Sequence, residues 1–413
     1  MSERFVIEGL AGKKTLQGEV EIKGAKNAAL KALPASVLFE DEMPMGNLPD
    51  IEDVRRMQEL IAGLKDGPVL RKDIAERLRA SIVLTGPVLA RDGEVTFPYP
   101  GGCVLGERPI DLFLQGFKAL GAEVEEKDDL FHFRAKNKKL KGARIFFPFI
   151  SVTATETLML AAVLAEGETV LQNAAMEPEI PVLAEYLNAC GANITGAGTP
   201  TITITGGGLL HAAGRKYVTP PDRIEAGSFI ILAALAGKEV KISHCEPKHM
   251  GALLAVLRRA DVDFEIGKDY VTVFGGNKEN SAYKLISVRT HEYPGFPTDL
   301  QAPMAVFMSQ ATGEGTLLET IFDGRFRYAD DLIRMGADIT VMNPHKILVR
   351  GPKNLSRKEL EGPDLRAGLA YILAATVAEG TSTINNPYVI DRGYERIEER
   401  LFALGLSIRR EQV

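Results

Sequence analysis

Four stretches of the chain repeat one pattern of apolar and polar positions. An apolar run of helical length is followed by a glycine and then by a run of alternating, often β-branched residues. The stretches are LAAVLAEGETVLQN (160–173), ILAALAGKEVKIS (231–243), FMSQATGEGTLLET (307–320) and ILAATVAEGTSTIN (372–385). This pattern predicts a buried helix that ends at a left-handed glycine and turns into a strand of a sheet.

A second helix is expected after each of these strands. It closes on phrases such as YLNACGANIT (186–195) and LIRMGADITV (332–341). Two less regular copies of the whole pattern precede the first clear one. We therefore count six repeats, three before about residue 219 and three after it, which predicts an α/β protein with two domains of three repeated units each.

Polar residues occupy the six predicted starts of the apolar helices. Counting back fourteen residues from positions 41, 93, 167, 237, 315 and 380 gives Asn27, Arg79, Thr153, Arg223, Gln301 and Arg366. Asn27 and Thr153, taken alone, favour simple helix capping. The three arginines place positive charge at the helix end that prefers negative charge, so we expect an anion there.

Composition and charge argue against a membrane-spanning, secreted or nucleic-acid-binding protein. The chain has 413 residues, of which 45% are apolar, and its longest apolar run, residues 367–378, is shorter than the roughly 20 residues that span a bilayer. Its first residues, MSERFVIEGL, lack the pattern of a signal peptide. We expect a soluble, cytoplasmic protein without a membrane partner. A net charge of −6 argues against nucleic acid as a partner.

One loop differs from its counterparts in the other repeats. The repeat from Gly93 to Gly121 is 28 residues long, against 24 from Gly167 to Gly191, and the extra length falls on PYPGGCVLGERP (98–109). A Gly- and Pro-rich loop that carries a thiol near Arg108 indicates a mobile lid. The guanidinium would also ease formation of the Cys103 thiolate. The other thiols, Cys190 and Cys245, are expected to be unpaired, and Cys190 to be buried packing.

Nine motifs, in order, resemble one family. They are GAKNAAL (24–30), RASI (79–82), PGGCVLGERPIDL (100–112), NAAMEPEI (173–180), PDRIEAGSF (221–229), FPTDLQA (296–302), ETIFDGRF (319–326), DLRAG (364–368) and IDRGYERIE (390–398). They resemble the UDP-N-acetylglucosamine 1-carboxyvinyltransferases, which are enolpyruvyl transferases related to EPSP synthase. The resemblance implies two inside-out α/β barrel domains, each with helices inside and sheets outside, and an active site in the interdomain cleft. The first domain would comprise residues 26–219, and the second residues 1–25 and 220–413.

The resemblance also implies an activity. Such an enzyme transfers the enolpyruvyl group of phosphoenolpyruvate to the 3-hydroxyl of UDP-N-acetylglucosamine and releases phosphate, the first committed step of peptidoglycan synthesis. It needs neither a cofactor nor a metal, and its oligomeric state stays open. Two alternatives remain: a transferase acting on shikimate 3-phosphate, which has no reason to keep the GGC loop, and a catalytically silent paralogue that binds a sugar nucleotide.

Site residues follow from the same resemblance. The implied catalytic residues are Cys103 as proton donor, Asp299 as candidate base, Lys26, Asp364 and Arg392. Phosphoenolpyruvate would be bound by Lys26, Asn27, Arg108, Arg325, Arg366 and Arg392, because bidentate arginine suits both phosphate and carboxylate. UDP-N-acetylglucosamine would be bound by Arg79, Arg108, Pro109, Ile110, Asp111, Leu112, Ser151, Val152, Asp299 and Ile321. Asp299 could also cap the helix that follows Pro297.

Some positions depart from the family pattern. A lysine, a histidine and a glycine of the family are replaced by Phe149, Phe113 and Thr153, which implies altered packing around the nucleotide. The segment between Asp53 and Arg79 is short by something like a strand pair, so the first repeat should be abbreviated. The stretch HCEPKH (244–249) offers only three metal ligands, and we do not expect a metal site there.

Overall fold

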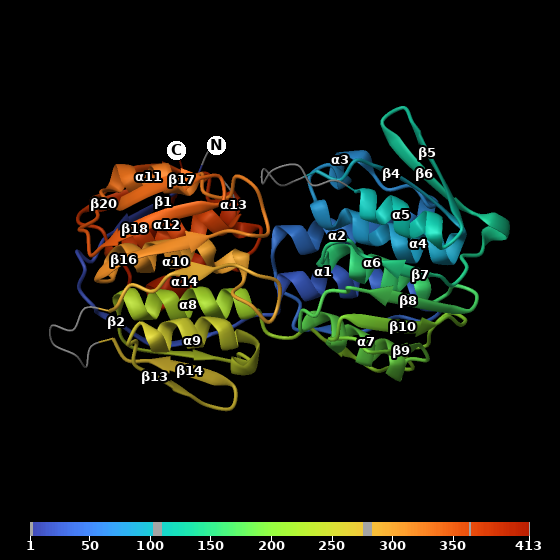
Figure 1. The fold of residues 1–413 in the computed structure, drawn as a ribbon, viewed down its shortest axis with the longest axis horizontal. Coiled ribbons are helices and arrows are strands. Elements are labelled where there is room, and N and C mark those ends of the chain that lie inside the picture. The colour runs from blue at the N-terminus through green and yellow to red at the C-terminus, as the bar shows by residue number, and fades with distance from the viewer. Residues whose placement is uncertain (1–2, 102–109, 276–282, 363–364, 413) are drawn as a thin grey trace. The chain divides into compact units, whose positions relative to one another are not determined.

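A computed structural model describes residues 3–101, 110–275, 283–362 and 365–412, without the side chains of residues 365 and 366 (Figure 1). The described residues form two compact units. We call residues 24–220 the N-terminal unit, and residues 3–23 together with 221–412 the C-terminal unit. Each contains helices and sheets, so the predicted α/β class is confirmed.

All six predicted helix starts are confirmed. Each of the six polar residues is the first or second residue of a helix. The helices are α1 (Lys26–Ala35), the 3₁₀ helix η3 (Arg79–Leu84) that continues into α4 (Thr85–Asp92), α6 (Val152–Ala162), α8 (Arg223–Ala236), α10 (Gln301–Gln310) and α12 (Leu365–Val377).

The capping interpretation of Asn27 and Thr153 is wrong. Helix α1 begins after Ala25 and has no side-chain cap. Helix α6 is capped two residues earlier than expected, because the Ser151 hydroxyl accepts a hydrogen bond from the Ala154 backbone N–H at 3.3 Å. The reason is positional: a cap precedes the first helical residue, whereas Asn27 and Thr153 already lie inside the helix.

The predicted left-handed stops are correct in only part of the repeats. Gly93, Gly167 and Gly380 have φ values of 79°, 91° and 85°. Gly237 does not, because α8 runs directly into β12 (Gly237–Ser243) with φ −79° and ψ 140°. Gly315 lies inside β16 (Gly313–Leu318). There the glycine serves a close approach, since a Cβ would stand 2.3 Å from Leu285 Cδ2.

The second helix of each repeat ends at a residue with positive φ close behind it. These helices are α2 (Glu52–Gly63), α5 (Asp111–Ala119), α7 (Glu179–Ala189), α9 (Gly251–Arg259), α11 (Tyr328–Met335) and α14 (Ile397–Ala403). The residues that follow them in the left-handed region are Gly67, Gly121, Gly191, Asp261, Gly336 and Gly405. This residue reverses the chain into the next strand or segment.

Four sheets share one topology among the described residues. Each has a parallel pair at one edge, and two antiparallel pairings complete it. Their strand orders are β7 (Arg144–Phe146), β8 (Glu168–Gln172), β10 (Thr201–Thr205), β9 (Asn193–Thr195); β2 (Leu16–Glu21), β12, β14 (Tyr270–Val273), β13 (Phe264–Ile266); β15 (Val288–Arg289), β16, β18 (Lys346–Gly351), β17 (Asp338–Asn343); and β19 (Glu359–Glu361), β20 (Thr381–Asn385), β1 (Glu3–Glu8), β21 (Ile408–Gln412).

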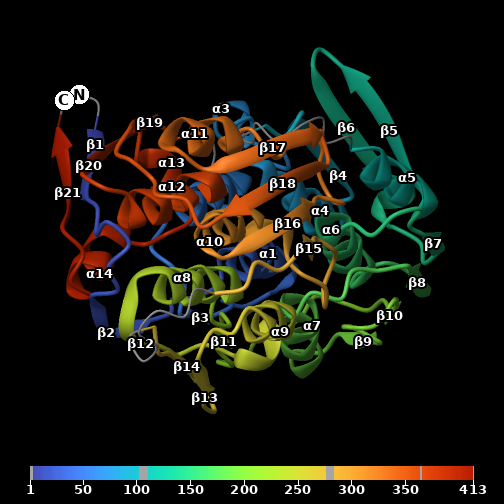
Figure 2. The same ribbon diagram turned by 60° about the vertical axis from the view of Figure 1, so that its left-hand side comes forward.

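Strand β1 shows why the C-terminal unit is discontinuous in sequence. It pairs with β20 and β21, so the two ends of the chain lie side by side in one sheet (Figure 2). Strand β2 pairs with β12 in another sheet of the same unit. The first residues of the chain therefore supply strands to the last and the fourth repeats.

Two sheets of the N-terminal unit are smaller. Strands β4 (Glu94–Pro98), β6 (Leu130–Ala135) and β5 (Ala122–Lys127) form one, whose parallel partner is reduced to a single bridge between Val69 and Thr96. The other pairs β3 (Met45–Gly46) with β11 (Tyr217–Val218). Residues 52–79, all described, hold helices and no strand beyond that bridge. The first repeat is abbreviated, as its short sequence predicts.

Apolar helices form the core of each unit. In the C-terminal unit, α8, α10 and α12 pack on one another, and in α8 all residues after Arg223 are buried. In the N-terminal unit, α4 packs on α6, and both contact η3. Helices apolar on all sides are stable only when surrounded by other elements. No helix within the described ranges is long and apolar enough to cross a membrane.

Candidate functional site

Lys26 is held in a buried ion pair in the N-terminal unit. It is the first residue of α1 and is 8% exposed, and its Nζ lies 2.7 Å from Oδ2 of Asp53, which is 2% exposed. Asp53 comes from α2 and was not among the predicted site residues. Removing a charged pair from water is costly unless the partners compensate each other, so Asp53 fixes where the Lys26 ammonium points. Asn27, the next residue of α1, is half-buried.

Arg79 meets the segment that leads into the cysteine loop. Its Nη1 donates a hydrogen bond to the Pro100 carbonyl at 3.0 Å, and its guanidinium lies 5.8 Å from the centre of the Tyr99 ring. Gly101 approaches the backbone of Glu76 so closely that a Cβ would stand 1.9 Å from its carbonyl oxygen. The predicted residues Cys103, Arg108 and Pro109 lie outside the described residues.

Two predicted nucleotide-binding side chains belong to the core. Ile110 and Leu112, which flank Asp111 at the start of α5, are 4% and 7% exposed. Asp111 between them is exposed. Of the two aromatic replacements, Phe113 is also buried, whereas Phe149 is 56% exposed.

Ser151 and Val152 lie at the start of α6, and both are half-buried. The Ser151 hydroxyl is occupied by its cap to Ala154. The unpaired N–H groups of the first helical turn remain a feature that suits anions. The predicted role of these two residues is compatible with their place at a helix start.

In the C-terminal unit, Asp299 and Arg325 are brought together. Asp299 lies in the 3₁₀ turn η6 (Thr298–Leu300) that leads into α10, and Arg325 follows β16 by seven residues and is 6% exposed. Arg325 Nη2 donates to Asp299 Oδ1 at 2.7 Å, and Nη1 donates to the Thr298 hydroxyl at 2.6 Å. No side-chain cap of α10 is present, so the capping reading of Asp299 is wrong. Its carboxylate instead pairs with the guanidinium.

Glu319, which the sequence reasoning missed, underlies this pair. It is 1% exposed, and its Oε1 accepts hydrogen bonds from the backbone N–H groups of Ile321 and Phe322 at 2.8 and 3.1 Å. Its Oε2 accepts from the Thr298 hydroxyl at 2.8 Å and from Gln301 Nε2 at 3.1 Å. The motif ETIFDGRF includes Glu319. A single carboxylate directly after a strand does not repeat at a helical or strand period, so the sequence pattern does not mark it as buried.

The remaining predicted residues are placed as follows. Ile321 is half-buried, and its backbone is bound to Glu319. Arg392 directly follows α13 (Tyr388–Asp391) and is half-buried. Arg366 is the second residue of α12, but its side chain lies outside the described part, as does Asp364. Arg223, an expected anion ligand, stacks 5.5 Å from the centre of the Tyr293 ring.

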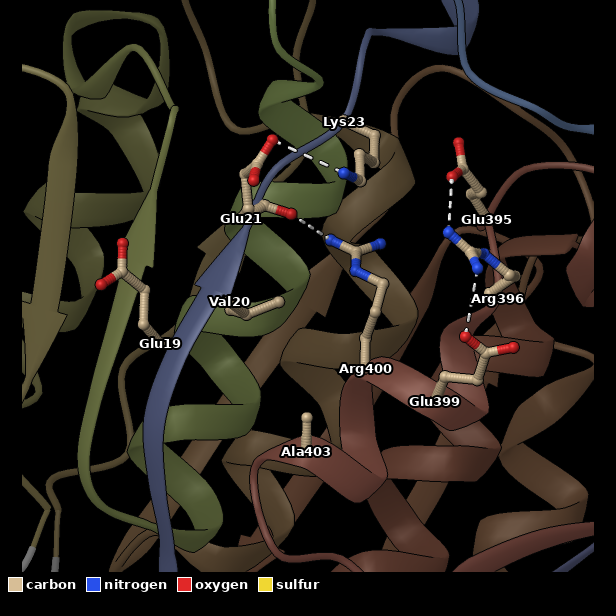
Figure 3. Close-up of a pocket in the computed structure, with 9 residues that line it drawn as sticks. All are labelled: Glu19, Val20, Glu21, Lys23, Glu395, Arg396, Glu399, Arg400 and Ala403. Carbon is tan, nitrogen blue, oxygen red and sulfur yellow. Dashed lines mark hydrogen bonds and ion pairs between the residues drawn. The ribbon is translucent and has the colours of Figure 1, made fainter.

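A cavity of about 180 Å³ in the C-terminal unit holds none of the predicted residues (Figure 3). It is lined by residues from two segments, 19–23 and 395–403. The charged side chains of this lining are paired within the protein. Arg400 donates to the Glu21 carbonyl and to the Glu225 carboxylate, and Arg396 lies 3.4 Å from Glu399. A smaller hollow is lined by Arg223, His249, Pro297 and Leu300 among others, and so adjoins Asp299.

Neither a disulfide nor a metal centre is present among the described residues. Cys190 and Cys245 are both buried and form no disulfide, and burial raises the pKa of the Cys245 thiol to about 11. Within the described ranges, no group of three or more His, Cys, Asp or Glu side chains could hold a metal ion, and this includes the HCEPKH stretch.

Comparison with known proteins identifies the family. The family model described as EPSP synthase (3-phosphoshikimate 1-carboxyvinyltransferase) matches residues 10–401. The chain belongs to the EPSP synthase family. Within it, the chain is 42% identical to a UDP-N-acetylglucosamine 1-carboxyvinyltransferase from Desulforapulum autotrophicum, over 97% of this chain and 98% of that protein. It is 41% identical to one from Acidobacterium capsulatum, over 99% and 96%.

Solved structures of the family share the fold. The crystal structure of the enolpyruvyl transferase NikO from Streptomyces tendae matches with a TM-score of 0.87 and 23% identity, covering 100% of this chain and 99% of that one. An EPSP synthase from Acinetobacter baumannii matches with a TM-score of 0.73 and 18% identity over 100% of both chains. The chain therefore has the enolpyruvyl transferase fold.

The buried pair of Lys26 and Asp53 leads to a prediction about stability. Asp53→Asn keeps the shape of the side chain but removes the negative charge beside a buried ammonium, so we expect a loss of about 3 kcal/mol in unfolding free energy. Urea unfolding followed by circular dichroism measures it, since the chain has no tryptophan. The control is Asp50→Asn, whose carboxylate pairs with Arg55 at 2.6 Å but is 71% exposed and should matter little. Equal losses in the two variants would contradict the prediction.

Proposed function

We propose that this protein is a UDP-N-acetylglucosamine 1-carboxyvinyltransferase that catalyses the first committed step of peptidoglycan synthesis. It transfers the enolpyruvyl group of phosphoenolpyruvate to the 3-hydroxyl of the sugar nucleotide and releases phosphate. The names of relatives that are 41–42% identical over almost the whole chain support this substrate. The observation that carries the proposal is the pairing of Asp299 with the buried Arg325, which joins a base and an anion-binding group in one place.

Each unit is proposed to be an inside-out α/β barrel built from three repeats. The buried helices of each unit, and the topology that four sheets of the described residues share, support this arrangement. The active site would then draw on both units, with Lys26 and Arg79 supplied by one and Asp299, Arg325 and Arg392 by the other.

Phosphoenolpyruvate needs several fixed cations, because it carries a phosphate and a carboxylate. In the proposed site Lys26, Arg108 and Arg392 bind the phosphate, and Asn27 adds a neutral donor. Arg325 and Arg366 bind near the carboxylate. Lys26 and Arg325 are held by carboxylates before any ligand arrives, so their charged groups are already oriented.

The proposed chemistry is an addition followed by an elimination. The sugar 3-oxygen bonds to C2 of phosphoenolpyruvate while its proton passes to Asp299, and C3 gains a proton from Cys103. Loss of a proton from C3 of the tetrahedral intermediate then re-forms the double bond as the C2–O bond to phosphate breaks. Asp364 is a second acidic group for these transfers. The nucleotide is bound by Arg79, Arg108, Pro109, Ile110, Asp111, Leu112, Ser151, Val152 and Ile321.

The acceptor specificity decides between the proposed function and its alternatives. With phosphoenolpyruvate present, we expect phosphate release on addition of UDP-N-acetylglucosamine and none on addition of shikimate 3-phosphate. The product should gain the mass of the enolpyruvyl group. Release with shikimate 3-phosphate alone would assign the other transferase activity. A protein that binds the sugar nucleotide in calorimetry but releases no phosphate would be the silent paralogue.

If Asp299 is the base, its substitution should lower turnover. Asp299→Asn is nearly isosteric but cannot accept the hydroxyl proton, so turnover should fall by about 100-fold or more. Phosphate release under saturating substrates measures it, and the melting temperature checks the fold. Turnover within twofold of the parent enzyme would remove Asp299 from the mechanism.

Cys103 should be the reactive thiol. Cys190 and Cys245 are buried, and the raised pKa of Cys245 keeps it protonated at neutral pH, so neither favours the thiolate that attacks electrophiles. By family resemblance the epoxide fosfomycin should alkylate Cys103, faster with UDP-N-acetylglucosamine present. Intact mass and peptide mapping should find one adduct. Cys103→Asp should retain an acid and some activity while taking no adduct, whereas an adduct on Cys190 would contradict the assignment.

A further inference from the structure

We propose that Glu319 is a positioning residue of the active site, which fixes Arg325 and Asp299 through the Thr298 hydroxyl. The effect of Glu319 on catalysis rests on the proposed function. The hydrogen-bond network around Glu319 does not, because it lies wholly within the C-terminal unit. Glu319 makes no contact of its own with Asp299 among the hydrogen bonds of the described residues, so it acts through its neighbours.

The four partners of Glu319 suit a carboxylate. All four are donors: two backbone N–H groups, one hydroxyl and one amide NH₂ group. A carboxylate offers acceptor sites on both oxygens, and hydrogen bonds to a charged group are the stronger kind. A glutamine at this place would turn its own NH₂ group toward two of the donors. The site therefore selects glutamate over its isosteric amide.

The Thr298 hydroxyl transmits this constraint. A hydroxyl has one proton, and next to a carboxylate that can only accept, the Thr298 proton points at Glu319 Oε2. The hydroxyl oxygen is thereby left to accept from Arg325 Nη1 at 2.6 Å. Since the guanidinium is planar and rigid, placing Nη1 also directs Nη2 toward Asp299 Oδ1 at 2.7 Å.

Glu319 also fixes the two segments that carry these groups. It accepts a hydrogen bond from Gln301, the first residue of α10, which directly follows the turn that holds Asp299. Through the N–H groups of Ile321 and Phe322 it holds the start of the loop that leads to Arg325. One buried side chain thus joins the base, the anion-binding arginine and the predicted nucleotide contact Ile321.

The test is a pair of substitutions on the same path. Glu319→Gln and Thr298→Val should each lower kcat by about 10- to 100-fold, since misplacement by about 1 Å can cost as much. KM for UDP-N-acetylglucosamine should change less than kcat. The double variant should be no worse than Glu319→Gln alone, because both changes break one path. Thr298→Ser, which keeps the hydroxyl, should restore most of the turnover lost in Thr298→Val.

A control carboxylate tests whether the loss of two backbone hydrogen bonds is by itself enough to lower turnover. Asp41 also accepts two backbone N–H groups, from Ala212 and Ala213 at 2.8 Å each, and lies in the N-terminal unit outside the proposed site. Asp41→Asn should leave kcat and KM unchanged. Additive effects of Glu319→Gln and Thr298→Val, or an unchanged kcat in Glu319→Gln, would overturn the proposal.

A crystal structure of the Glu319→Gln variant tests the placement of Arg325 directly. This test does not depend on whether the unmodified protein is active. We expect the Arg325 Nη2 to Asp299 Oδ1 contact to be lost or lengthened beyond hydrogen-bond range, with the rest of the unit unchanged. An intact contact in the variant would refute the positioning role. If the parent releases no phosphate with either acceptor, the proposed function fails, and the crystal structure still tests the placement of Arg325.

Discussion

The pairing of buried cations with carboxylates is the constraint on which the proposed site depends. A guanidinium that is 6% exposed, as in Arg325, cannot be left without compensation in a low-dielectric surrounding. Asp299 provides the opposite charge and Thr298 a neutral acceptor. The same contacts that make the buried arginine tolerable also give it one orientation. Stability and preorganisation for an anionic substrate therefore come from the same hydrogen bonds.

The N-terminal unit uses the same principle at its central helices. Lys26 and Lys31, five residues apart on α1, pair with carboxylates from two different helices, Asp53 on α2 and Glu156 on α6. Burial raises the pKa of Glu156 to about 8, and Lys31 opposes that rise. Removing the carboxylate of either pair would leave a buried ammonium without its partner, which is costlier than removing both partners. These pairs fix how three helices of the unit face one another.

The repeats show how one supersecondary unit is adapted without losing its topology. In four sheets the same parallel pair and antiparallel pairs recur, whereas the first repeat has lost its hairpin and the second keeps its parallel strand only as the bridge at Val69. The shortened parts lie in the N-terminal unit, between Lys26 and Arg79 in the chain. The core tolerates this because the buried helices, rather than the edge strands, supply most of its apolar surface.

Local rules account for what the sequence by itself determined. The apolar helices with polar first residues, the count of six repeats and the family could all be predicted. Each is recorded in contiguous stretches of sequence, either as a repeated local pattern or as a motif. Lys26, Asp299 and Arg325 could be singled out for the same reason. Only the tertiary structure decided what those residues touch. Asp53 and Glu319 lie 27 residues from Lys26 and 20 from Asp299 in the chain, and a buried carboxylate has no periodic signature. The left-handed conformation expected at Gly237 and Gly315 was wrong for a similar reason. In a sequence, a glycine needed because other atoms approach its Cα closely cannot be told from one needed for a positive φ.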